Sequence, residues 1–168
     1  KDPKRLLAEV VLKKEILTIA MPFNTALNGR KYETLSIEWL AMQKPGHAFL
    51  KKRPRLPGQQ YPGLGLASRA VELLLITAWR LKLSGLLNTP QYYHNAYLYS
   101  KIFFYINPEH QAKLKAMQRD LANYSLDQVA WALEWGAVKE KNTALPFKWL
   151  PGRQIVPLEE NLKKLLDR

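Results

Sequence analysis

Apolar and polar residues alternate along the first part of the chain in a way that predicts strands. Between Thr34 and Met42 the apolar residues recur at nearly every second position, which is typical of a strand with one buried face. Residues 6–21 fit either a helix or two strands, because both spacings occur among their apolar residues. Asn28-Gly29 lies between apolar runs and predicts a hairpin turn.

A second pattern begins after residues 53–63, where several Pro and Gly residues exclude a regular element. From Ser68 to Leu83 the apolar residues follow helical spacing and also occupy the other side of the helix, so we expect a buried helix. Leu86-Leu87 leaves room only for a short strand, and His94 to Phe104 predicts a second, aromatic helix.

Helix starts dominate the rest of the chain. Asn107-Pro108 combines a cap with Pro at the first helical position, and the four residues Ser125 to Gln128 form a capping box. An extended stretch and a closing amphipathic helix follow. This change near residue 107 divides the chain into an α/β core, residues 1–106, and a helical C-terminal extension, residues 107–168, packed on the same domain.

Three tryptophans lie in this extension. We expect them to bury its helices against the sheet, and an exposed interaction surface is the alternative. They are Trp131, Trp135 and Trp149.

The composition restricts the class of protein. The chain has 168 residues, 47% of them hydrophobic, which is enough for one domain with a full core. It has no cysteine, which excludes disulfides, thiolate zinc sites and a Cys nucleophile. No apolar stretch is long enough to span a bilayer, and the sequence indicates no metal-ligand cluster. The lack of cysteine and of an export sequence favours the cytoplasm.

The net charge of +12 is concentrated near the N-terminus. Residues 1–58 carry 12 basic and 5 acidic side chains, and the densest run is Lys51-Lys52-Arg53-Pro54-Arg55. Such a run forms either a solvated loop or a patch for an anion, which can be nucleic acid, an acidic membrane face or a phosphorylated cofactor.

A glycine-rich turn follows the basic run and enters the predicted helix near Leu66. A turn of this kind exposes backbone N–H groups at the positive end of a helix, which suits phosphate. It lacks the Gly-Lys-Ser/Thr of a Walker loop, and Ser68 stands where a dinucleotide fingerprint needs its third Gly. The turn comprises Gln60, Tyr61, Pro62, Gly63, Leu64 and Gly65.

This segment resembles the GNAT superfamily of N-acetyltransferases. The family's cofactor motif, Gln/Arg-x-x-Gly-x-Gly/Ala, is matched at every position from Gln60 to Gly65. Its later Leu-Tyr-x-Lys-x-Gly-Phe is similar to the run from Leu98 to Phe104. The resemblance covers about residues 55–106 and implies an α/β (α+β) fold with a mixed, mostly antiparallel sheet flanked by helices.

The resemblance also implies a reaction, the direct transfer of an acetyl group from acetyl-CoA, or of another acyl group from its acyl-CoA, to an amine of a small molecule or protein. The backbone N–H groups of Tyr61 to Leu66 would hold the pyrophosphate, with Gln60 completing the loop. The Lys51–Arg55 run would approach the adenosine 3′-phosphate. Tyr99 corresponds to the family's general acid. A purely structural role, as one of the aromatic residues on a packed helix face, explains it equally well.

A general base is expected on the strands before the loop, where Glu33 and Glu38 are the available carboxylates. Glu38 has apolar neighbours, so we expect it to be partly buried and select it as the general base. The alternative is that Glu38 simply faces solvent from a strand and has no catalytic role. His94 follows Tyr92 and Tyr93 and is a candidate substrate-site residue, or else a structural one.

Two other functions stay open. One is a catalytically degenerate scaffold of the same fold, which Phe103 favours because the family has Gly at that position. The other is a basic module that binds nucleic acid or a partner through stacking tyrosines. Those tyrosines are Tyr61, Tyr92, Tyr93 and Tyr97.

Overall fold

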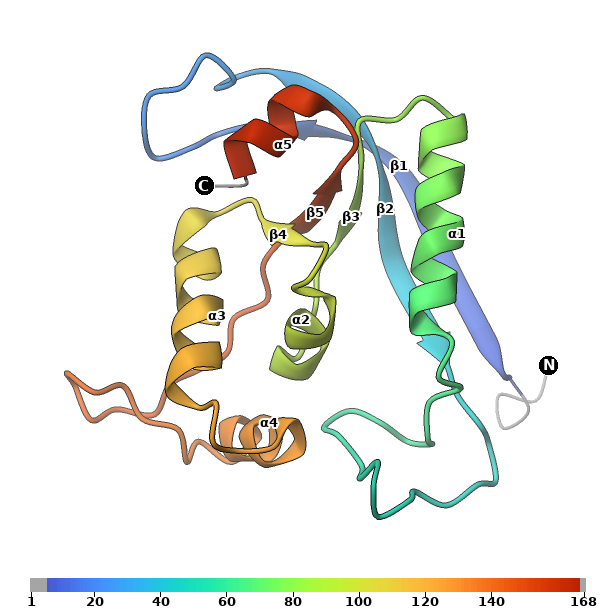
Figure 1. Ribbon diagram of the computed structural model, residues 1–168, viewed down its shortest axis with the longest axis vertical. Helices are drawn as coiled ribbons and strands as arrows, with labels where there is room; N and C mark the ends of the chain where they lie inside the picture. The colour runs from blue at the N-terminus through green and yellow to red at the C-terminus, as the bar shows by residue number, and fades with distance from the viewer. Residues whose placement is uncertain (1–5, 167–168) are drawn as a thin grey trace.

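A five-stranded open sheet with helices on both faces forms the α+β fold of the chain (Figure 1). The computed structural model describes residues 6–166. The strands are β1 (Ala8–Thr18), β2 (Lys31–Met42), β3 (Gly85–Asn88), β4 (Phe104–Tyr105) and β5 (Gln154–Pro157). The helices are α1 (Ala67–Arg80), α2 (Tyr93–Tyr99), α3 (Pro108–Asp120), α4 (Leu126–Glu134) and α5 (Glu160–Leu166). The predicted mixed, mostly antiparallel sheet is confirmed.

β1 and β2 form a long antiparallel hairpin, so the ambiguous N-terminal run is a strand. The turn between them is built around the predicted Asn28-Gly29. The Asn28 side chain accepts a hydrogen bond from the N–H of Met21 at 2.8 Å, and Gly29 has a φ of +80°. A glycine is needed there because other residues adopt this backbone conformation at a cost.

The sheet order is β1-β2-β3-β5-β4, and β2 and β3 are its parallel pair. α1 lies in the crossover between these two strands. β5 comes from residues 107–168 and inserts between β3 and β4, antiparallel to both. The extension therefore adds three helices and also a central strand.

Alternating side chains of β3 face opposite layers of the core. Leu86 packs with Val71 and Ala78 of α1, whereas Leu87 packs with Leu162 of α5. Because successive side chains of a strand point to opposite faces, α1 and α5 cover opposite faces of the sheet. A third cluster joins α2, α3 and α4 around Tyr105 at the β4 edge.

The predicted caps of α3 and α4 are confirmed. Asn107 accepts a hydrogen bond from the N–H of Glu109 at 2.8 Å, and Pro108 is the first residue of α3. Ser125 and Gln128 form the capping box of α4, in which the N–H of Ser125 donates to the Gln128 side chain at 2.9 Å.

Three expectations about burial and length were wrong. α1 is not fully buried, because Leu73 and Trp79 are 65% and 70% exposed. α2 ends at Tyr99, five residues before the predicted end, since Phe103 turns back into the core beneath α1. Trp135 is 74% exposed and stacks on Trp131 instead of packing against the sheet.

None of the helices within residues 6–166 has both the length and the apolar character needed to cross a membrane.

Candidate functional site

A long loop, residues 43–66, leaves the end of β2 and returns to it before α1 begins. The N–H of Lys44 donates to the carbonyl of Pro62 at 2.8 Å, and the N–H of Leu64 donates to the carbonyl of Met42 at 3.2 Å. These two bonds hold Gly63 opposite Gln43. The glycine turn therefore lies at the carboxyl end of a parallel strand, where ligands bind in open α/β sheets.

The glycine turn leaves space and free donors beside the start of α1. Gly63 is exposed, and a Cβ on it would have the Met42 carbonyl as nearest neighbour, at 3.7 Å. Among the described residues, the N–H groups of Gly63, Gly65 and Leu66 have no hydrogen-bond acceptor. No side chain caps α1. The turn thus presents unpaired donors at the positive end of a helix, which suits a phosphate.

An arginine adds positive charge at this turn. Gly65 has a φ of +74°, and a Cβ on it would lie 3.6 Å from Nη1 of Arg53. Arg53 belongs to the basic run, all of whose members are exposed. The loop therefore brings part of that run to the glycine turn, so the residues present fit an anionic phosphate group.

The cofactor-binding residues expected from the sequence differ in whether their backbone N–H groups are free to bind a ligand. Gly63, Gly65 and Leu66 provide free N–H groups. Pro62 has no N–H, and Leu64 already donates its own to Met42. Gln60 is exposed and Tyr61 is half-buried at the start of the turn. The N–H of Tyr61 has no acceptor within residues 6–166 either, but only the second half of the predicted segment adjoins α1 and Arg53, so this half is the candidate phosphate site.

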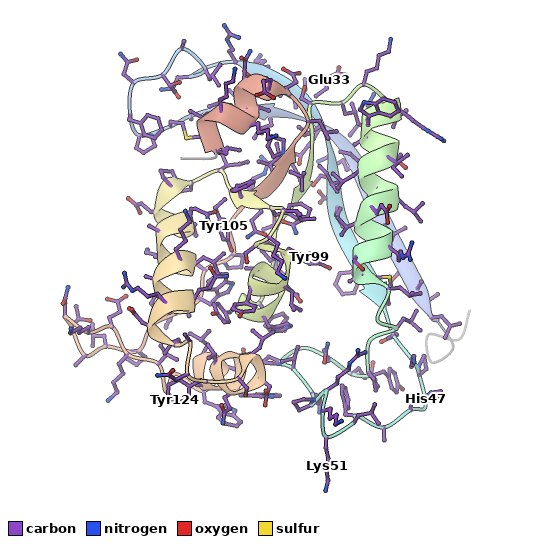
Figure 2. All side chains as sticks on the ribbon, viewed as in Figure 1. Glu33, His47, Lys51, Tyr99, Tyr105 and Tyr124 are labelled. Atoms are coloured by element: carbon purple, nitrogen blue, oxygen red, sulfur yellow. The ribbon has the colours of Figure 1, made fainter. Side chains whose placement is uncertain are left out.

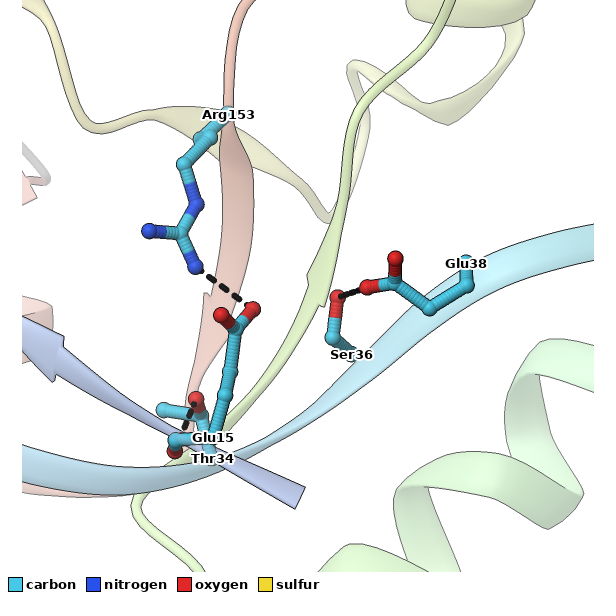
Figure 3. Close-up of polar contacts among 5 residues, drawn as sticks. All are labelled: Glu15, Thr34, Ser36, Glu38 and Arg153. Carbon is cyan, nitrogen blue, oxygen red and sulfur yellow. Dashed lines mark hydrogen bonds and ion pairs between the residues drawn. The ribbon is translucent and has the colours of Figure 1, made fainter. Parts of the chain in front are cut away.

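Glu38 lies at an irregularity in β2. Val11 pairs with Trp39 and Leu12 pairs with Ile37, so Glu38 is an extra residue without a partner in β1. Such a β-bulge re-aims a side chain. Glu38 is exposed, which corrects the expected burial, and its carboxylate accepts a hydrogen bond from the Ser36 hydroxyl at 2.7 Å (Figure 3). The Arg153–Glu15 ion pair, 2.6 Å, joins the residue before β5 to β1.

The parallel pairing of β2 with β3 stops next to the bulge at Glu38. Its last matched residues are Ile37 and Asn88, where β3 ends. From Glu38 to Met42 the edge of β2 that faces away from β1 therefore has no strand beside it. This edge runs from the bulge to the glycine turn.

Tyr99 is the last residue of α2 and packs against the core beneath α1. Its ring meets the ring of Phe103 edge-on, with centroids 5.8 Å apart, and it contacts the cluster that contains Leu35 and Val71. Burial raises the pKa of the Tyr99 hydroxyl above its usual value of 10. The hydroxyl is consequently protonated at neutral pH.

The two predicted catalytic residues come from different elements: Glu38 lies in β2, and Tyr99 ends α2, the helix after β3. No hydrogen bond joins them among the described residues. Glu33 lies near the start of β2, remote from the loop that carries Lys51 (Figure 2). The geometry therefore favours Glu38 over Glu33 as the carboxylate near the glycine turn.

His94 is buried at the start of α2, and its ring stacks on Tyr92 with centroids 5.4 Å apart. Burial lowers its pKa to about 4. It lines a pocket of about 290 Å³ with residues of α4 and with Trp149. The sequence pattern singled out His94 but not this pocket, because its lining comes from separate segments between residues 57 and 150.

Comparisons with protein-family models, with curated proteins and with solved structures found no match. Within residues 6–166, no three His, Asp or Glu side chains come together in a way that could hold a metal ion.

Proposed function

We propose that the chain is an acyl-CoA-dependent N-acyltransferase, which transfers the acetyl group of acetyl-CoA, or another acyl group, to an amine. The observation that carries the proposal is the glycine turn, where the free N–H groups of Gly63, Gly65 and Leu66 lead into α1. Arg53 lies beside Gly65 of this turn. Unpaired amides at a helix N-terminus, with an arginine, suit the pyrophosphate of coenzyme A.

The unpaired edge of β2 supports the same function. The thiol-bearing arm of coenzyme A contains amide groups, and such groups can hydrogen-bond to a free strand edge as an added strand does. The unpaired edge runs from Glu38 to Ala41 and leads directly to the glycine turn, where the Met42 carbonyl already accepts from Leu64. An arm bound along it, with its pyrophosphate at the turn, directs its thioester end toward the bulge at Glu38.

Glu38 and Tyr99 would then divide the proton transfers. Acetyl-CoA supplies the acyl group as a thioester, and the amine forms the new C–N bond as the C–S bond breaks. Glu38 accepts the proton that the amine loses, and its exposed carboxylate is accessible for that role. Tyr99 donates a proton to the departing sulfur, which suits a hydroxyl that burial keeps protonated.

The release of free thiol from acetyl-CoA, measured with a thiol reagent, tests the proposal. The protein itself gives no background signal, because the chain has no cysteine to react with the reagent. We expect release that depends on an added amine, screened as small amines and as peptides with a free amino group. Glu38→Gln should slow release by about 100-fold, the lower range for a general base. Glu33→Gln is the matched control and should leave the rate unchanged.

Two results of this assay would contradict the proposal. Thiol release that no amine accelerates excludes acyl transfer, and tight binding of acetyl-CoA without any release identifies a scaffold instead. An equal effect of Glu33→Gln and Glu38→Gln removes Glu38 from the mechanism.

The exposed basic run also favours a second function, nucleic-acid binding. The four tyrosines expected to stack on bases give it little support, because only Tyr97 is exposed, whereas Tyr93 is buried and the other two are half-buried. This function predicts affinity for single-stranded nucleic acid that falls steeply as salt rises. The absence of a salt-dependent gel shift would exclude it.

A further inference from the structure

The pocket at the start of α2 is built from four separate segments of the chain. Its volume is about 290 Å³, and it lies just beyond the carboxyl end of β3. Pro57 of the basic loop forms one wall, Tyr92 and His94 form another, and the segment with Lys148 and Trp149 closes it against Glu134 of α4. A pocket of this size admits a ring system, whereas it is too small for a whole coenzyme.

Two ring nitrogens among the lining residues lack a hydrogen-bond partner. Nδ1 of His94 and Nε1 of Trp149 are both buried, and neither has a partner within the described part of the chain. His94 as a whole is 3% exposed. Buried polar atoms are nearly always paired. These two differ from other unpaired ones, such as the Tyr32 hydroxyl, because they belong to residues that line this pocket, which favours a ligand with hydrogen-bonding groups.

The surrounding rings favour a flat ligand. Tyr92 stacks on His94 at an interplanar angle of 18°, and Tyr93 meets Trp149 edge-on at 5.4 Å. Burial lowers the pKa of His94 to about 4, so its ring is neutral at pH 7. Glu134 and Lys148 carry opposite charges. The pocket is therefore aromatic and polar without a net charge of its own.

The positive charge lies next to the pocket, on the loop that supplies Pro57. The exposed side chains of Lys51, Lys52, Arg53 and Arg55 belong to this loop. Its course beside the pocket is fixed at two points. Nε1 of Trp131 in α4 donates to the carbonyl of Arg55 at 2.8 Å, and Gly58 packs on the ring of Tyr92.

We propose that this pocket binds the heteroaromatic base of a nucleotide, with the phosphates of that nucleotide directed toward the basic loop. The Trp149 Nε1–H donates to a ring nitrogen of the base, and His94 supplies a second hydrogen bond. An acyl-CoA is one source of such a nucleotide, in which case the inference rests on the proposed function, and a free nucleotide is the other source.

Titration with adenosine 3′,5′-bisphosphate, followed by calorimetry, tests the inference. We expect binding, and we expect ribose 1,5-bisphosphate, which carries two phosphates but no base, to bind at least tenfold more weakly. Trp149→Phe keeps an aromatic ring but removes the donor, and should weaken binding of the bisphosphate about tenfold. Trp135→Phe is the matched control, because Trp135 is exposed and lies outside the pocket, and it should bind like the original chain.

A second variant, His94→Phe, retains a ring to stack on Tyr92 and should also weaken binding of the bisphosphate. The test therefore does not depend on the correct folding of Trp149→Phe alone. Equal binding of the base-free ribose 1,5-bisphosphate and of adenosine 3′,5′-bisphosphate would overturn the inference, as would equal affinities of Trp149→Phe and Trp135→Phe. No binding of the bisphosphate at millimolar concentration would overturn it as well.

Acetyl-CoA and acetyl-pantetheine separate this inference from the proposed function. If acetyl-CoA is bound and turned over but Trp149→Phe changes neither, the inference fails and the acyltransferase stands. If the bisphosphate binds through Trp149 but no thiol is released, the acyltransferase fails and the nucleotide pocket stands. Turnover of acetyl-pantetheine with weaker binding than acetyl-CoA supports the acyltransferase, and weaker binding of acetyl-CoA by Trp149→Phe supports the nucleotide pocket.

Discussion

Gly58 packs so closely against Tyr92 that a Cβ on residue 58 would lie 2.6 Å from the tyrosine ring. This contact joins the basic loop to the start of α2. Gly58 also has a φ of +75°, which favours glycine. Steric fit and backbone conformation thus both require glycine where the loop meets the pocket.

Replacing Gly58 by alanine should destabilise the fold by roughly 2 kcal/mol, the sum of backbone strain and the clash with Tyr92. Gly46→Ala is the matched control in the same loop. Gly46 has a φ of +78°, but a Cβ on it would have nothing within 4 Å, so only the strain remains. Urea unfolding of the two variants measures the difference. Equal losses of stability would show that the Tyr92 contact does not hold the loop.

Removing the Tyr99 hydroxyl should separate binding from turnover. The ring packs against Phe103, so Tyr99→Phe preserves the packing, and we expect the affinity for acetyl-CoA to be unchanged. Thiol release should slow by about 100-fold, because the departing sulfur loses its proton donor. Tyr97→Phe, on an exposed position of the same helix, should release thiol at the original rate. Equal rates for both variants would exclude Tyr99 as the general acid.

The buried His94 should make the fold sensitive to acid. Its pKa is about 4 in the folded chain, against about 6.5 when unfolded, so only the unfolded state takes up the proton between these values. Stability contributed by neutral His94 is complete above pH 6.5 and falls as the pH drops toward 4, by roughly 3 kcal/mol in all.

Urea unfolding at pH 7 and at pH 4.5 measures this effect as the difference between variants. His94→Gln should lose less stability on acidification than the original chain. His47→Gln should lose as much as the original chain, because His47 is exposed. The same loss in all three proteins would show that His94 can be protonated in the folded state.

Local patterns in the sequence predicted much of this fold. Asn107 and Ser125 mark helix starts through bonds that reach only a few residues, so their effect can be recognised in the sequence. β5 is different, because its four residues include a proline and owe their place to pairing with β3, more than sixty residues earlier. The extended character of that stretch was predictable, but its insertion into the sheet was not.

In the candidate site, too, features set by neighbouring residues were predictable and features set by distant residues were not. The glycine turn and its entry into α1 follow from consecutive residues and were expected. The exposure of Glu38 depends on a bulge set by the register with β1, which the alternation of residues does not reveal. The meeting of His94 with Trp149 depends on how the extension packs on α2, so the sequence indicated only the histidine.

Calorimetric titration with acetyl-CoA tests the central claim, that the glycine turn holds the phosphates of an acyl-CoA, most directly. We predict binding, and a gain of about 2.7 kcal/mol in stability when the ligand is at 100 times its dissociation constant. Gly63→Asp should abolish binding, because the position has room for the side chain but the added charge repels the pyrophosphate. Gly46→Asp adds the same charge elsewhere in the loop and should retain binding. No heat and no stabilisation at millimolar acetyl-CoA, or undiminished binding by Gly63→Asp, would contradict the account.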